Sequence, residues 1–79
     1  MNRTRLDAAL VAAHEADDKA ALVRLYRQAG EASEAGGNID AACFFYTQAY
    51  VFALESGDPA RAALLAKLAA HGRDANIDG

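Results

Sequence analysis

A pattern that occurs twice in the chain is the feature that most constrains its fold. At an offset of about 40 residues, the stretch 6–30 aligns with the stretch 46–70, and this offset is typical of helical repeats. Besides several alanines, the aligned identical pairs are Val11 and Val51, Glu15 and Glu55, Asp18 and Asp58, and Leu25 and Leu65. The duplication predicts stacked helical hairpins, which bury their apolar faces against one another and commonly hold a partner.

Capping residues and apolar periodicity predict an all-α fold. The predicted helices cover about residues 5–16, 18–35, 39–56 and 59–71, followed by a polar tail at 73–79 that we expect to be disordered. A hydroxyl-then-carboxylate spacing at Thr4 predicts the cap of the first helix. Asp17 or Asp18 can cap the second helix and Asn38 the third. No segment alternates with the period of a strand, so we expect four antiparallel helices in one domain.

Glycine and proline mark the two clearest breaks. The Gly36-Gly37 pair ends the second predicted helix, because glycine adopts the left-handed conformation at a helix C-terminus without a steric penalty. Gly57 ends the third helix in the same way. Asp58 then supplies a capping carboxylate, and Pro59 suits the first helical position, where its missing N–H is not needed.

The third predicted helix is unusually aromatic. It holds five of the six aromatic residues in the chain, namely Phe44, Phe45, Tyr46, Tyr50 and Phe52. A helix that is apolar on most sides is typically central and buried. Its neighbours are short and rich in alanine, however, and rings that they leave bare would form a patch suited to an interface. We therefore expect either a wholly buried aromatic set or a partner-binding patch that uses Tyr50 and Phe52.

Charge and composition narrow the class of partner. The formal net charge is -3, and the eight Lys and Arg residues are scattered, whereas proteins that bind nucleic acid or anionic membranes usually carry a basic stripe. No apolar run approaches the roughly 18 residues that span a bilayer, and the apolar run that follows Arg5 is too short for a signal peptide. We expect a cytoplasmic protein that binds neither nucleic acid nor membrane.

Two short motifs resemble the tetratricopeptide repeat. Ala42, Tyr46 and Ala49 have the small-x3-aromatic-x2-small spacing of the second helix in that repeat. Tyr26 with Ala29 resembles the aromatic-x2-leucine signature of the first helix, although alanine stands where leucine is usual. Together with the intervening turn, these motifs cover about residues 23–56. The resemblance implies one full repeat flanked by two half repeats; the alternative is a generic four-helix bundle.

The resemblance also implies where a ligand would bind, because the first helices of these repeats line the concave face. On this chain that face would be formed by the second and fourth predicted helices, with the polar residues Arg24, Arg27, Gln28 and Lys67. Forked hydrogen bonds from the arginines would suit a peptide carboxylate. The simpler interpretation is a solvated face on which Arg27 pairs with Glu31 one turn away.

Residues capable of catalysis or metal binding do not combine into a recognisable set. His14 and Asp18 share a helix face and could contact a metal together with Glu15 or Asp17, but the other histidine, His71, is distant in sequence. The single cysteine, Cys43, has no sequence context that would activate its thiol. The chain is therefore expected to be non-enzymatic, without cofactor or metal.

Three hypotheses remain open at this stage. The first is a protein-interaction module or small adaptor of the tetratricopeptide type, which binds another protein. The second is a structural homo-oligomer, such as a homodimer, built through the aromatic third helix. The third is a small ligand-binding bundle.

Overall fold

The computed structural model of the chain describes residues 3–72 and contains four α-helices within that range. In chain order they are α1 (Arg3–Glu15), α2 (Lys19–Ala35), α3 (Ile39–Ser56) and α4 (Ala60–Ala70). Residues 3–72 form no strand, which confirms the predicted all-α class. The tail 73–79, predicted to be disordered, lies outside the described residues.

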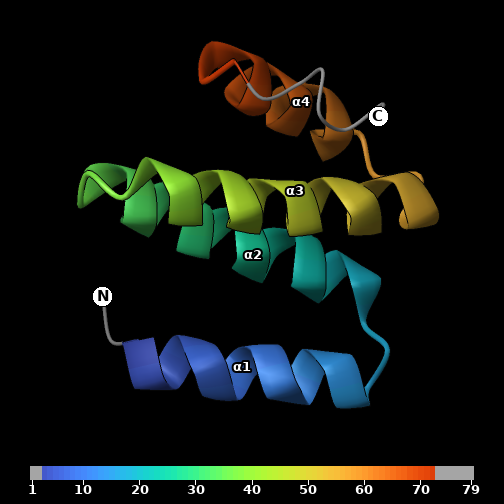
Figure 1. Cartoon of the computed structure of the whole chain (residues 1–79). Helices are drawn as coiled ribbons and strands as arrows, with labels where there is room; N and C mark the ends of the chain where they lie inside the picture. The colour runs from blue at the N-terminus through green and yellow to red at the C-terminus, as the bar shows by residue number, and fades with distance from the viewer. Residues whose placement is uncertain (1–2, 73–79) are drawn as a thin grey trace.

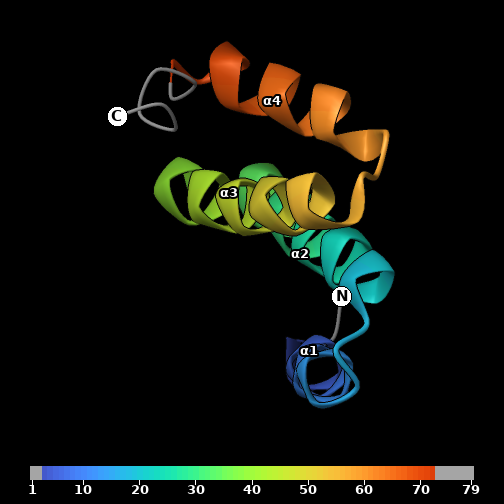
Figure 2. The ribbon, with the colours of Figure 1, turned by 90° about the vertical axis from the view of Figure 1, so that its right-hand side faces the viewer.

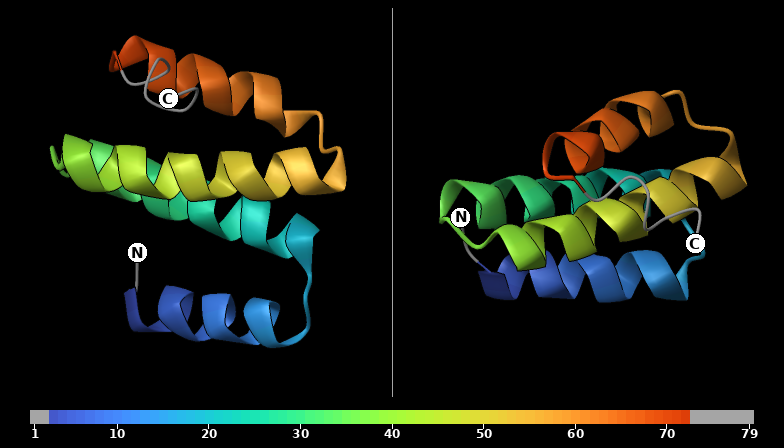
Figure 3. Two further views of the ribbon diagram at one scale, coloured as in Figure 1. Left: turned by 45° about the vertical axis from the view of Figure 1, so that its right-hand side comes forward. Right: turned by 45° about the horizontal axis from the view of Figure 1, so that its top comes forward.

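Successive helices run in opposite directions and pack on one another in chain order (Figure 1). α2 and α3 form the central pair, with α1 packed on α2 and α4 packed on α3. The view at right angles in Figure 2 and the oblique views in Figure 3 agree that α1 and α4 lie on opposite sides of this pair. The arrangement is an antiparallel stack of helical hairpins, as the sequence predicts.

Most of the predicted breaks between helices are confirmed by capping geometry. The side chains of Asp18 and Asn38 each accept a hydrogen bond, 3.1 Å long, from the backbone N–H three residues on. Asp58 accepts one of 2.8 Å from the N–H of Ala60. Gly57 adopts the left-handed conformation, with φ of 68°, at the C-terminus of α3. These bonds satisfy backbone groups that the helix ends would otherwise leave unpaired.

Three of the four predicted helix starts differ from the observed ones by one or two residues. α1 already begins at Arg3, so Thr4 lies inside the helix, and α2 begins at Lys19. Pro59 has helical dihedral angles, as predicted, but the first residue of α4 is Ala60. Helix ends commonly shift by this amount.

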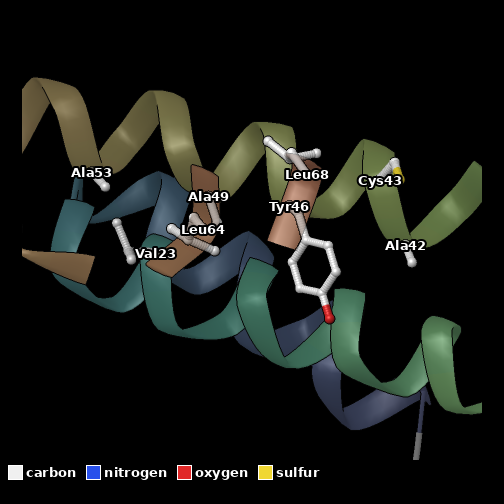
Figure 4. Packing of buried hydrophobic residues seen from close by; sticks show 8 residues of the cluster. All are labelled: Val23, Ala42, Cys43, Tyr46, Ala49, Ala53, Leu64 and Leu68. Carbon is white, nitrogen blue, oxygen red and sulfur yellow. The ribbon is translucent and has the colours of Figure 1, made fainter. Parts of the chain in front are cut away.

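The main core combines small side chains of α3 with larger ones from its neighbours (Figure 4). Along α3 the fully buried residues are Ala42, Tyr46, Ala49 and Ala53, and those of α4 are Leu64 and Leu68. The alanines allow the helices to approach closely, and the Tyr46 ring fills the space between them. At Gly30 of α2, an added Cβ would lie 2.6 Å from the ring of Tyr46, so only glycine fits there without displacement.

A smaller core attaches α1 to the rest of the molecule. It is formed by the buried residues Ala13, Ala21 and Leu22, with Leu10 and Leu25 packed against it. Leu6, nearer the start of α1, is also buried. Among the described residues, no side chain of α1 is enclosed as completely as Leu64 and Leu68 of α4, from which we expect α1 to be held less firmly than α4.

Apolar periodicity predicts one stripe of Leu22, Leu25, Tyr26 and Ala29 on α2 and one of Leu64, Leu65, Leu68 and Ala69 on α4. Only part of each stripe is buried. Leu65 and Ala69, expected in the buried stripe of α4, are exposed, because α4 has neighbours on one side only. Conversely, Val23 is buried outside the predicted stripe of α2, because it belongs to the core cluster that includes residues of both α3 and α4. The number of neighbouring helices, which periodicity does not reveal, sets the width of each buried face.

Candidate functional site

A polar network around Glu34 ties three helices together. The Glu34 carboxylate of α2 accepts a hydrogen bond of 3.1 Å from the hydroxyl of Tyr46 on α3. It also accepts one of 3.2 Å from the ammonium of Lys67 on α4. On its other oxygen, the Nε2 atom of His71 lies 2.6 Å away. We call these four residues the Glu34 network; the sequence alone gave no signal for it, because its members are spread over three helices.

The electrostatics of the network suit a structural clamp. Hydrogen bonds from His71 and then from Lys67 hold the pKa of Glu34 below its ordinary value. Burial, followed by the hydrogen bond to Glu34, raises the pKa of Tyr46. The carboxylate therefore stays ionised and the phenol stays neutral near pH 7, so neither is poised to exchange a proton with a substrate. Lys67 also lies 5.7 Å from the centre of the Tyr46 ring, within the range of a cation–π contact.

An aromatic cluster fixes the C-terminal half of α1. The Nε2 atom of His14 lies 2.9 Å from the hydroxyl of Tyr26, and its ring stands edge-on to that of Phe52, with centroids 5.8 Å apart. Tyr26 and Phe52 are stacked at 5.9 Å. Phe52, a predicted partner contact, is therefore half-buried between helices, and Tyr50 is likewise half-buried against the main core.

The large apolar side chains that α3 exposes lie instead on the side facing away from the core. Phe44, Val51 and Leu54 have exposed fractions of 58%, 40% and 47%. Their spacings of seven and three residues place them on one helix face; we call these three residues the outer face of α3. Sequence reasoning selected Tyr50 and Phe52 and missed this face. The sequence did contain a signal for this face, because helical spacing places these three residues opposite the small residues of α3, and those small residues are the buried ones.

The residues predicted to grip a carboxylate are partly engaged within the chain. Arg24 and Gln28 are exposed on α2. Arg27 lies 3.6 Å from the carboxylate of Glu31, which is the ion pair that the simpler interpretation predicted. Lys67 belongs to the Glu34 network. Two of the three expected cations of the concave face, Arg27 and Lys67, thus each contact a carboxylate of α2.

A groove lies between the N-terminal half of α1, the C-terminal half of α2 and the start of α3. Its volume is about 460 Å³. The lining residues are Leu6, Asp7, Leu10, Ala29, Ala32, Ser33, Gly36, Asn38, Ala41 and Phe45. We call this cavity the α1 groove; Asp7 carries its only charge among the described residues. No sequence pattern indicated the groove, because it depends on how α1 is inclined to α2.

Other reactive groups do not assemble into a centre within the described range. Cys43 is a free, buried thiol. In residues 3–72 no three histidine, cysteine, aspartate or glutamate side chains converge as metal ligands. None of the four described helices has the length and apolar character required to cross a bilayer.

Comparisons with protein-family models, with curated proteins and with solved structures found no match to this chain.

Proposed function

We propose that the chain is a non-enzymatic protein-interaction module of the tetratricopeptide type, which works in the cytoplasm and binds another protein through the outer face of α3. The observation that carries the proposal is the exposure of Phe44, Val51 and Leu54 along one face of a helix whose opposite face is fully buried. Apolar side chains aligned in this way are typical of a surface that receives a partner helix.

The inverted distribution of side-chain size on α3 supports a role for this face. Three of the four fully buried residues of α3 are alanines, whereas a phenylalanine and a leucine face solvent. Complete burial of a side chain of this size contributes about 1.5–3 kcal/mol, of which a part is already realised in the monomer. The rest of this free energy would be gained when a partner removes the three neighbouring apolar side chains from water.

Two packing features support the tetratricopeptide-like part of the proposal. Successive helices pack as antiparallel hairpins. In addition, Tyr46 fills the space next to Ala42 and Ala49, which is the role that the resemblance assigns to these positions. A second candidate surface is the polar face of α2, because Arg24 is exposed there one turn from the Arg27–Glu31 pair.

Affinity capture from the source cells with paired variants tests the proposal. The double variant Phe44→Asp with Leu54→Asp places charges on the outer face of α3. The matched control is Val11→Asp on α1, since Val11 is as exposed as Phe44, at 58%. We expect the double variant to lose a partner that the wild type and the control retain. Unchanged capture by the double variant would contradict the proposal and favour the α2 surface, which Arg24→Glu with Arg27→Glu would then test.

Light scattering on the purified proteins separates a foreign partner from a second copy. A wild-type dimer that the double variant converts to a monomer would assign the outer face of α3 to self-association. A monomer at all concentrations, combined with specific capture, would assign it to a different protein.

A further inference from the structure

We infer that the α1 groove is a second binding site, which accepts a short segment of a partner protein with an apolar side chain next to a lysine or arginine. Its lining contains none of the three residues of the outer face of α3, although the two surfaces adjoin where Phe44 meets Phe45. This site does not depend on the function proposed for that face.

The groove arises where small side chains of α2 face the N-terminal half of α1. His14 and Ala13, in the C-terminal half of α1, pack against α2 and, through Phe52, against α3. Towards the N-terminal half of α1, the facing positions of α2 carry the short side chains of Ala29, Ala32 and Ser33. These side chains are too small to fill the space between the helices, and a cavity remains.

The groove is large enough to hold more than one side chain of a partner at the same time. Its volume of about 460 Å³ lies within the range of roughly 300–1,000 Å³ found for ligand sites. Leu6, Leu10, Ala41 and Phe45 supply apolar lining from two helices. An apolar side chain of the partner would replace water against this lining, which is the main source of favourable free energy.

The charge of the groove indicates which residue of the partner should lie next to its apolar side chain. The Asp7 carboxylate is exposed at the lining and is the only charged group there among the described residues. The Phe45 ring lies in the same lining and attracts cations through its π face. The Phe44 ring extends this aromatic surface outwards, with its centroid 5.6 Å from that of Phe45. A carboxylate and an aromatic ring in one apolar groove complement a lysine or arginine, whose aliphatic stem also packs on apolar surface.

The net charge of the chain, -3, agrees with this choice. An acidic segment would be repelled both by Asp7 and by the protein as a whole, whereas a basic segment is attracted at long range. The chemistry therefore favours a basic, partly apolar peptide segment over an acidic one.

Nuclear magnetic resonance titration of the full chain tests this inference. The probe is the dipeptide Leu-Arg, acetylated at its N-terminus and amidated at its C-terminus, and Leu-Glu with the same end groups is the comparison. We expect Leu-Arg to shift the amide signals of Leu6, Asp7, Ser33 and Phe45 in the millimolar range. Leu-Glu should bind several-fold more weakly. Absence of shifts in the groove, or equal binding of both dipeptides, would overturn the inference.

Paired charge variants strengthen the test. Asp7→Lys reverses the charge in the groove, and Glu15→Lys makes the same change at another exposed position of α1 outside the lining. We expect Asp7→Lys to weaken Leu-Arg binding roughly three- to tenfold, because an attraction becomes a repulsion, and Glu15→Lys to leave it unchanged. If the two variants weaken binding equally, the dipeptide is attracted non-specifically by the net charge of the protein, and the assignment to the groove is wrong.

A third variant removes the cavity without changing charge. Ala32→Phe places a ring in the groove from an exposed position of α2. Circular dichroism of this variant is the control that checks whether the helices are retained. Loss of Leu-Arg binding in this variant is the expected result. Binding that persists with the groove filled would contradict the proposed location.

Discussion

The two outer helices are attached to the central pair in different ways. α4 inserts two fully buried leucines, Leu64 and Leu68, and is also tied to α2 through the Glu34 network. α1 buries one leucine and one alanine, Leu6 and Ala13, and the His14–Tyr26 hydrogen bond joins its C-terminal end to α2. One end of the stack is therefore closed by packing and ion pairs, while the other keeps a groove open.

The largest difference between the two attachments should appear in core truncations. Leu68→Ala removes a fully buried side chain of α4, and we expect a loss of about 2–5 kcal/mol in the free energy of unfolding. Leu10→Ala removes a half-buried side chain of α1, for which we expect about 1 kcal/mol. Urea denaturation followed by circular dichroism measures both. Equal losses would show that α1 and α4 are held equally firmly.

A smaller effect is expected where α2 meets Tyr46. Gly30→Ala places a Cβ 2.6 Å from the Tyr46 ring, and the displaced ring should cost roughly 1–3 kcal/mol of stability. Gly36→Ala is the control, since its Cβ would lie no closer than 3.5 Å to another atom and its φ of -83° suits any residue. We expect the control to change the free energy of unfolding by less than about 0.5 kcal/mol. A stable Gly30→Ala variant would show that the Tyr46 ring is not tightly enclosed.

The smallest effect should come from acid. Hydrogen bonds from His71 and Lys67 hold the pKa of Glu34 below its ordinary value of 4.5. A carboxyl group whose pKa is lowered on folding stabilises the fold above its unfolded pKa, and that contribution is lost as the pH falls through the folded pKa. We expect unfolding measured between pH 6 and 3 to show a decline in stability that is shallower in Glu34→Gln. The control Glu31→Gln should retain the full decline if the Glu34 network is responsible.

Local signals predicted the helices well, because their ends are set by neighbouring residues. Asn38 and Asp58 cap their helices as expected, and Gly57 adopts the left-handed conformation. The first helix begins at Arg3, two residues before the predicted start.

Surfaces formed between helices were much harder to predict. Glu34 and His71 are 37 positions apart and meet only because α4 crosses α2 at a particular angle. Similarly, Phe52 was expected either in the core or at a partner interface, and its half-burial, with the ring of His14 of α1 edge-on to it, depends on how α1 packs. Helical periodicity defines the faces of one helix, but it does not say which faces other helices will cover.

Site-specific photo-crosslinking tests the central proposal, binding through the outer face of α3, most directly. Benzoyl-phenylalanine in place of Val51 puts a reactive group on that face, and the same residue in place of Val11 provides an exposed control on α1. Irradiation in the source cells should join the chain to one discrete product from position 51, either a different protein or a second copy of this 8.3 kDa chain, and to none from position 11. No product from position 51, or the same product from both positions, would contradict it.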